Sequence, residues 1–340
     1  MDYRNLGSTG VKVSELCLGA MMFGAWGNTD HEDSTRIIHA ALDAGINFID
    51  TADVYGAGES EEILATALAG RRDDVVLATK CHLAMGTDPN TQGSSRRWIM
   101  RACEDSLRRL NTDYIDLYQM HRLQDGCAHD ETLGALTDLV RAGKIRYLGS
   151  STYPPSEIVE AQWVAERRGR ERFVCEQPPY SILYRGIEAE MLPTAQRHDM
   201  GVICWGPLGG GWLSGRWRLG ATEMESSRAN RIPSRYDLSR PGNQHKLEVV
   251  EELAVLAEEL GISLIHLSLA FVLQHPAITS AIVGPRTMDH LVSQVGAVDV
   301  ELDGSTLDRI DKIVRPGSNV VASDAGYVPP AILDKRLRRR

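Results

Sequence analysis

The fold is decided by the stretch Asn47-Phe48-Ile49-Asp50-Thr51-Ala52-Asp53-Val54-Tyr55, in which a short apolar strand passes directly into acidic and phenolic residues. Residues 33–44 before it and 60–68 after it have the spacing of amphipathic helices, with apolar side chains three or four positions apart. Short apolar strands flanked by helices are typical of a parallel sheet that is covered on its outer side. The stretch therefore predicts one strand–helix unit of an α/β protein.

The same unit recurs along the chain. We expect the other strands at 16–19, 74–80, 114–121, 145–150, 173–177, 202–205 and 278–283. We expect the other helices at 96–110, 131–142, 155–168, 188–198, 246–260, 263–274 and 288–295. Eight strands favour a closed barrel, because an open doubly wound sheet typically uses fewer. The predicted fold is an α/β (β/α)8 TIM barrel in a single domain over residues 1–340.

Three segments lie outside the repeat. Residues 1–14 are expected to form a β-hairpin around the turn Gly7-Ser8-Thr9-Gly10. Residues 215–243 form a long irregular stretch after strand seven, and we predict a lid loop there because such long loops are usually functional or disordered. Residues 316–340 are predicted to be a C-terminal tail, and its basic end, 335–340, is interpreted as solvated.

The composition argues against nucleic-acid and membrane partners. The 340 residues carry a net charge of −9, which disfavours binding to polyanionic surfaces. No apolar run approaches the roughly 18 residues of a membrane span, and the opening Met1-Asp2-Tyr3-Arg4 does not begin a signal peptide. The six cysteines are scattered without a C-x-x-C pair, which indicates buried, reduced thiols. We therefore expect a cytoplasmic protein.

Four chemically distinct side chains follow neighbouring strands at one rim of the predicted barrel, where chemistry occurs in this fold. Asp50 and Tyr55 follow strand two, Lys80 ends strand three and His121 ends strand four. A nearby ammonium lowers the pKa of a phenol, an acid can keep a buried lysine ionised, and a histidine can orient a substrate oxygen. Taken singly, each residue is more often structural. Together, the four suit proton transfer to a carbonyl oxygen.

The chain resembles the aldo-keto reductase superfamily over nearly its whole length, in particular its bacterial and potassium-channel-β-like branch. The resemblance is carried by Gly45-Ile46-Asn47-Phe48-Ile49-Asp50-Thr51-Ala52-Asp53-Val54-Tyr55-Gly56, by the opening residues 6–19 and by residues 106–121. It implies a catalytic tetrad of Asp50, Tyr55, Lys80 and His121. It also implies NADPH-dependent reduction of an aldehyde or ketone to the alcohol, with Tyr55 as the general acid.

Two glycine- and arginine-containing loops are candidates for the cofactor site. The sequence contains neither G-x-G-x-x-G nor a P-loop, so a nicotinamide cofactor would need a barrel-type phosphate site after strands seven and eight. Trp205 precedes a glycine-rich run at 206–211 that lets backbone N–H groups approach a pyrophosphate. Arg286 stands just before a helix whose N-terminus favours an anion. A plain turn and an exposed arginine are the alternative interpretations.

The resemblance implies more specific roles. Ser151 and Thr152 would meet the nicotinamide carboxamide, with Thr152 in place of the usual asparagine. Arg286 would recognise the 2′-phosphate of NADP(H), Arg216 the pyrophosphate and Gln294 the adenine. The full set of expected cofactor-binding residues is Gly19, Ala20, Met21, Asp50, Ser151, Thr152, Gln177, Trp205, Gly206, Pro207, Leu208, Gly210, Arg216, Gly284, Arg286, His290 and Gln294.

The substrate is expected to be a small-molecule carbonyl compound, keto-sugars included. Its pocket residues are expected among those that follow strands one, three and five, namely Met22, Phe23, Trp26, His82 and Tyr153.

Two other functions fit parts of the sequence. A cofactor-binding regulatory subunit resembling potassium channel β subunits is the main alternative, and the intact tetrad argues against it. A metal-dependent hydrolase would use His121, Cys127 and His129, but no paired carboxylate–histidine set with metal spacing occurs and Lys80 would repel a cation. We therefore expect no metal. The resemblance leaves both a monomer and a homo-oligomer open.

Overall fold

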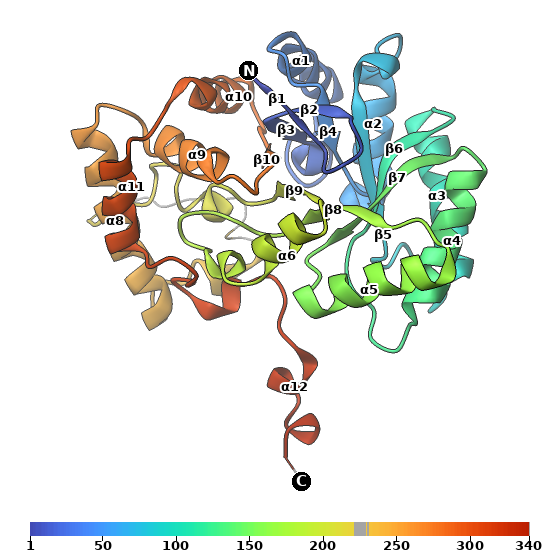
Figure 1. Cartoon of the computed structure of the whole chain (residues 1–340). Coiled ribbons are helices and arrows are strands. Elements are labelled where there is room, and N and C mark those ends of the chain that lie inside the picture. The colour runs from blue at the N-terminus through green and yellow to red at the C-terminus, as the bar shows by residue number, and fades with distance from the viewer. Residues whose placement is uncertain (221–228, 230, 340) are drawn as a thin grey trace.

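Eight parallel strands close into a barrel, and helices surround it (Figure 1). The computed structural model describes residues 1–220, 229 and 231–339. Around the barrel the strand order is β10-β3-β4-β5-β6-β7-β8-β9. The strands are β3 (Leu16–Gly19), β4 (Phe48–Asp50), β5 (Val76–Cys81), β6 (Ile115–Met120), β7 (Ile145–Ser151), β8 (Phe173–Gln177), β9 (Gly201–Cys204) and β10 (Ser280–Val283). The predicted (β/α)8 TIM barrel is confirmed.

An antiparallel hairpin covers one end of the barrel. It consists of β1 (Tyr3–Asn5) and β2 (Lys12–Ser14), with Tyr3 opposite Ser14. Leu6 and Val13 of this hairpin are fully buried against inward-facing strand residues such as Phe48. Gly7 makes the close approach possible, because a Cβ there would lie 2.7 Å from the Asp199 carbonyl oxygen. The hairpin therefore closes the end of the barrel opposite to the site described below.

The helices bury their apolar faces against the outside of the sheet. Polar residues cap several of them, as when the Asp30 carboxylate accepts from the backbone N–H groups of Glu32 and Asp33. The helices are α1 (His31–Asp43), α2 (Glu59–Ala67), α3 (Arg96–Leu110), α4 (His129–Arg141), α5 (Pro155–Arg168), α6 (Met191–Arg197), α8 (Pro241–Glu259), α9 (Leu264–Gln274), α10 (Met288–Val295), α11 (Gly304–Ile313) and α12 (Pro330–Leu333).

Three helical features differ from the sequence-based expectation. Helix α8 begins at Pro241, five residues before the predicted start, because proline is tolerated in the first helical turn. The helix predicted at 188–198 is divided into a 3-10 turn, Gly186–Glu188, and α6. Helices α11 and α12 were not predicted, and Asp303 caps α11 by accepting from the Thr306 backbone N–H.

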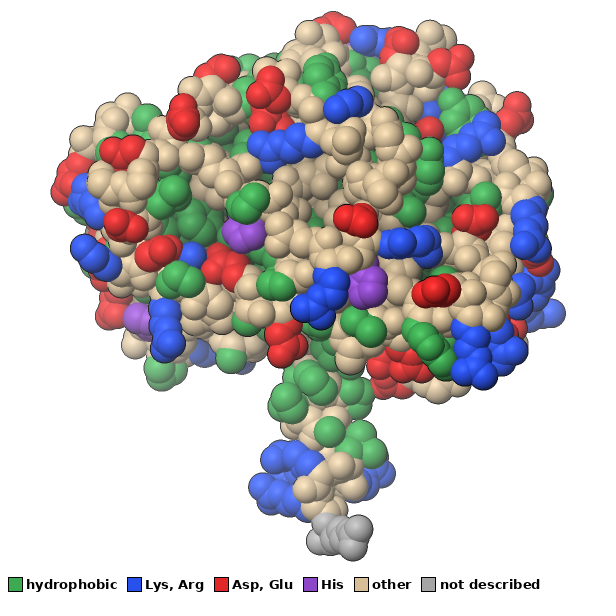
Figure 2. All heavy atoms as spheres, viewed as in Figure 1, with side chains coloured by type: hydrophobic (Ala, Val, Ile, Leu, Met, Phe, Trp, Pro, Cys, Tyr) green, Lys and Arg blue, Asp and Glu red, His purple; other side chains and the backbone are tan. Residues whose placement is uncertain are grey.

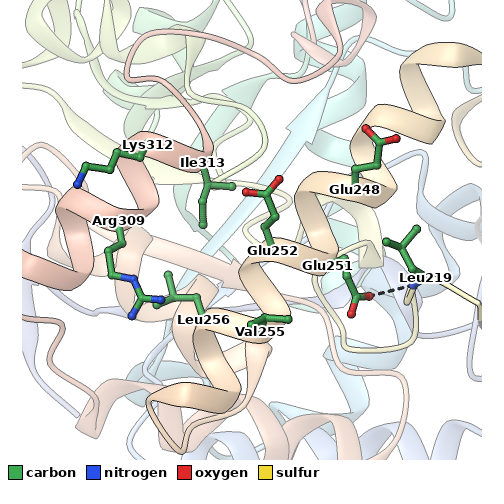
Figure 3. Close-up of a pocket in the computed structure, with 9 residues that line it drawn as sticks. All are labelled: Leu219, Glu248, Glu251, Glu252, Val255, Leu256, Arg309, Lys312 and Ile313. Carbon is green, nitrogen blue, oxygen red and sulfur yellow. Dashed lines mark hydrogen bonds between the residues drawn. The ribbon is translucent and has the colours of Figure 1, made fainter.

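The predicted lid at 215–243 is described only at its two ends, and residues 221–228 and 230 lie outside the described residues. At the first end, Arg218 contacts both carboxylate oxygens of Glu251. The Leu219 backbone N–H donates to the same carboxylate over 2.9 Å (Figure 3). At the second end, the Tyr236 ring stacks near Trp212 and Trp217. Both described ends are therefore fixed to the body of the barrel.

The predicted tail at 316–340 has two parts that behave differently. Its first part packs on the barrel, since the Arg185 backbone N–H donates to the Ser318 carbonyl oxygen and Lys246 bonds the buried Asp324 at 2.5 Å. Its second part, which contains α12, projects away from the body (Figure 1). Figure 2 shows hydrophobic side chains followed by Lys and Arg along this projection.

Two further observations concern membrane-spanning helices and the cysteines. Among the described residues, no single helix is long and apolar enough to cross a membrane, although the bent pair α8 and α9 passes that test jointly by length and composition. All six cysteines are free thiols; five are buried as predicted, whereas Cys127 is partly exposed.

Candidate active site

The predicted tetrad gathers at the carboxyl end of the barrel. Asp50 ends β4, Lys80 lies in β5, His121 follows β6, and Tyr55 begins the turn after β4. The Lys80 Nζ lies 2.6 Å from the Asp50 Oδ2 and 3.5 Å from the Tyr55 hydroxyl. The Tyr55 and His121 rings meet edge to face, with centroids 5.8 Å apart. A phenol, an ammonium and an imidazole thus share one small space.

Asp50 is the fixed anion of the group. Its Oδ2 accepts from Lys80, and its Oδ1 accepts from the side-chain amides of Gln119 at 3.1 Å and Gln177 at 2.8 Å. Burial lowers the pKa of Lys80, but the Asp50 carboxylate and Tyr55 outweigh burial, so the pKa is raised overall. Lys80 therefore stays charged although its side chain is fully buried.

Tyr55 is held in its protonated form in this structure. Burial raises its pKa, and this effect exceeds the opposing effect of Lys80. The sequence had indicated a lowered phenol pKa, because burial of the hydroxyl could not be judged from sequence. A phenol that keeps its proton is the form needed to donate one.

His121 is held neutral. Burial lowers its pKa well below the ordinary value, and the charges of Lys80 and Arg122 act in the same direction. Its buried Nδ1 has no hydrogen-bond partner among the described residues. A neutral imidazole in this position can donate one hydrogen bond to a substrate oxygen without taking up the proton.

A tight turn places Tyr55 at the mouth of the barrel. Gly56, Ala57 and Gly58 all have positive φ angles, which suits glycine at the two outer positions. The Tyr55 ring also contacts Trp26, with centroids 5.7 Å apart, so the phenol is packed between an indole and an imidazole.

A cavity of about 540 Å³ opens over this group. The following predicted residues line it: Gly19, Met21, Met22, Trp26, Asp50, Tyr55, His121, Ser151, Gln177, Trp205, Gly206, Pro207, Leu208, Gly210, Arg216, Gly284, Arg286, His290 and Gln294. Six predicted residues are not part of the lining: Ala20, Phe23, Lys80, His82, Tyr153 and Thr152.

Each of these six has a structural explanation. Lys80 lies beneath the floor of the cavity, where it bonds to Asp50 and to the Thr51 carbonyl oxygen. His82 turns aside to Ser94, at 3.1 Å, and Tyr153 is buried. The remaining two apolar residues, Ala20 and Phe23, are buried in the core.

Thr152 lies just behind the lining. Its hydroxyl accepts from the Trp205 indole N–H at 3.4 Å, so it supports an aromatic side chain that does line the cavity. Its φ of +59° is in the left-handed region, where a β-branched residue is unusual. Asparagine adopts this conformation more readily, which gives a physical reason for the residue expected from the resemblance.

Basic side chains and glycines line the part of the cavity where the phosphates of a cofactor were predicted. Arg216 Nη2 and the His290 Nε2 are 2.9 Å apart, and the Arg286 backbone N–H donates to His290 Nδ1. A Cβ added at Gly206 or Gly211 would meet no atom within 4 Å, so these loops leave open space beside their backbone. These residues fit a dinucleotide that carries phosphate groups.

Gln294 is a buried polar residue in the wall of the same cavity. It is buried and lines the cavity, yet its Oε1 has no hydrogen-bond partner among the described residues. The buried Gln294 oxygen thus remains an unsatisfied acceptor in the cavity wall.

Several lining residues were not predicted. Arg122 had a sequence signal, because it directly follows His121 at a strand end. Arg231, Arg235 and Gly326 had none, because they reach the cavity from long irregular segments. The other unpredicted lining residues are Val54, Leu83, Gly211, Ser214, Trp217, Ile232, Ile265, Ile282, Val283 and Ser293. Within the described part of the chain, no three His, Cys, Asp or Glu side chains are grouped as a metal site.

Comparison with known proteins agrees with a barrel oxidoreductase. Residues 15–315 match the model of the aldo/keto reductase family. The chain belongs to this family.

Named relatives cover nearly the whole chain. It is 40% identical over 325 residues to the uncharacterized oxidoreductase YrpG of Bacillus subtilis, covering 92% of this chain and 96% of that protein. It is 33% identical over 329 residues to a probable voltage-gated potassium channel subunit beta of Arabidopsis thaliana, covering 93% and 97%. It is 33% identical over 356 residues to versiconal hemiacetal acetate reductase of Aspergillus parasiticus, covering 98% of each.

Proposed function

We propose that this oxidoreductase reduces an aldehyde or ketone to the alcohol with NADPH, and that Tyr55 is the general acid. The observation that carries the proposal is the buried Lys80, which lies 2.6 Å from the Asp50 carboxylate and 3.5 Å from the Tyr55 hydroxyl. A bound nicotinamide would supply a hydride to the carbonyl carbon.

The protein's own residues manage the proton and the orientation. The Tyr55 hydroxyl donates its proton to the carbonyl oxygen, and the neighbouring Lys80 ammonium stabilises the phenolate that remains. The neutral His121 donates a hydrogen bond to the same oxygen and so fixes its position. Asp50 holds Lys80 in place, because its Oδ2 accepts from Lys80 while its Oδ1 is fixed by Gln119 and Gln177.

The cofactor is proposed to lie across the cavity from Trp205 to Gln294. Ser151, Gln177 and Trp205 line the nicotinamide end, and Arg216 and Arg286 line the phosphate end. A guanidinium suits a phosphate monoester, so Arg286 supports NADP(H) over NAD(H). We place the protein in the cytoplasm, acting on a small molecule.

The test is loss of NADPH absorbance with a panel of aldehydes and ketones. We expect Tyr55→Phe to lower kcat by about 100-fold or more, since general-acid catalysis contributes that much. Tyr114→Phe is the matched control, because the Tyr114 hydroxyl contacts Asp73 away from the cavity. Near-normal turnover in Tyr55→Phe would contradict the assignment. Tight NADPH binding without turnover in the wild type would instead favour a regulatory subunit like the relatives named as channel β subunits.

A further inference from the structure

Two arginines stand at the catalytic side of the cavity without a role in the reduction itself. Arg122 follows β6 next to His121, and Arg235 ends the short turn Pro233–Arg235 of the long loop after β9. Both line the cavity. They share this cavity with the Tyr55 phenol, and Arg122 is fixed beside the site by its bonds to the His121 carbonyl oxygen and the Ser151 hydroxyl.

Arg122 is incompletely satisfied by the protein. Its Nη1 donates to the His121 carbonyl oxygen at 2.5 Å and to the Ser151 hydroxyl at 3.4 Å, both neutral acceptors. Among the described residues no carboxylate lies within ion-pair distance of it. The nearby buried Glu176 is occupied by the Ser150 hydroxyl and the Tyr153 backbone N–H. A half-buried guanidinium that makes no ion pair has capacity for an anion.

The charges that face this side of the cavity are mostly positive. Arg235 Nε lies 3.7 Å from Asp324 Oδ1, and Lys246 bonds the other oxygen, Oδ2, at 2.5 Å, so two cations share this one carboxylate. Asp50 is the acidic residue in the lining, and Lys80 neutralises it. Arg231 lies over the Trp26 ring at 4.3 Å and adds a third guanidinium to the same side.

Arg122 lies on the other side of the barrel from the arginine proposed for the 2′-phosphate. Arg286 follows β10, whereas Arg122 follows β6, and the closed order β10-β3-β4-β5-β6-β7-β8-β9 places these two strands four positions apart in both directions. They therefore lie on opposite sides of the barrel. A phosphate bound at Arg286 is therefore remote from Arg122, and an anion at Arg122 would be a second, separate group.

We propose that Arg122 and Arg235 form an anion site beside Tyr55, so that the preferred carbonyl substrate carries a carboxylate or phosphate group. The proposal rests on the reductase function proposed above, and it deepens that function by naming the substrate class. The carbonyl oxygen meets Tyr55 and His121 while the anionic group meets Arg122 and Arg235.

The test compares matched charged and neutral aldehydes with NADPH. Succinic semialdehyde is paired with its methyl ester, and glyceraldehyde 3-phosphate with glyceraldehyde. We expect kcat/KM to favour the charged member of at least one pair by about tenfold or more, as for a hydrogen bond to a charged group. The pair that shows the preference distinguishes a carboxylate from a phosphate substrate.

Single substitutions show which arginines cause the preference for charged substrates. Arg122→Met and Arg235→Met should each lower the charged-to-neutral ratio of kcat/KM by about tenfold. Arg101→Met removes one positive charge from an exposed site on α3 and should leave the ratio unchanged. Equal kcat/KM values within both pairs, or an unchanged ratio in both cavity variants, would overturn the anion site while leaving the reductase function intact.

Binding measurements distinguish a failure of the anion site from a failure of the proposed reductase function. If no carbonyl compound were reduced, the reductase function would fail, and calorimetry with 4-hydroxybutanoate and inorganic phosphate would decide on the anion site. Binding of either probe that is lost in Arg122→Met supports the site. No binding to the wild type overturns it.

Discussion

The buried ion pair of Lys80 and Asp50 permits a prediction about the free energy of unfolding, whose size follows from the contacts of the two side chains. Lys80→Met removes the cation and leaves Asp50 charged, with its Oδ2 unpaired in a fully buried position. Breaking a buried ion pair by removing one partner costs about 3–5 kcal/mol. Asp50→Asn should cost a similar amount, because it turns an amide group toward the Lys80 ammonium.

The double variant is the informative measurement. In Lys80→Met with Asp50→Asn no unpaired charge remains, and the new amide oxygen can still accept from Gln119 and Gln177. Its cost should therefore be smaller than the sum of the single costs by about 1–3 kcal/mol, which is typical of directly contacting residues.

Urea unfolding, followed by tryptophan fluorescence, gives the free energies. Lys144→Met is the control, because Lys144 pairs with Glu104 at a partly exposed site, where a pair contributes about 1 kcal/mol or less. Additive costs for Lys80→Met and Asp50→Asn, or a Lys80→Met cost no larger than that of the control, would refute the reasoning.

Two other predictions concern the cofactor and pH. Arg286→Ala should raise KM for NADPH by about tenfold with little change for NADH in steady-state assays, and equal effects on both cofactors would argue against a 2′-phosphate contact. Burial of the Asp53 carboxyl is the main cause that raises its pKa from 3.8 to about 8, and the nearby charge of Glu61 is the second cause. The folded state therefore keeps a proton that the unfolded state loses, so this group lowers stability as pH rises from about 4 to about 8. Asp53→Asn should flatten the fall in Tm over that range; parallel Tm curves for variant and wild type would contradict this.

The sequence predicted most of the barrel because its strands are local patterns. A short apolar run such as 47–51 between two amphipathic segments carries its own periodicity, and eight such units leave few alternatives. Helix α11 was missed although its signal is present, since Asp303 is a good cap and Leu307 and Ile310 have helical spacing.

The site was predictable where a residue stands at a strand end. Tyr55, Lys80 and His121 were found because residues at the carboxyl ends of the strands gather at one rim of a barrel. Burial was not predictable in the same way, since the raised pKa of Tyr55 depends on residues from several distant elements. Arg235 and Gly326 reach the cavity through long irregular segments, whose paths are set by tertiary contacts alone.

The C-terminal segment 318–326, which packs back on the barrel, has a consequence for biosynthesis. Residues 318–326 hold Asp324 against Lys246 and bring Gly326 to the cavity wall, and they leave the ribosome after every strand of the barrel. The eight strands are therefore synthesised before the segment that completes the cavity wall. A protein tag joined beyond the projecting α12 would hang clear of the barrel, whereas a truncation before residue 318 would open the cavity wall.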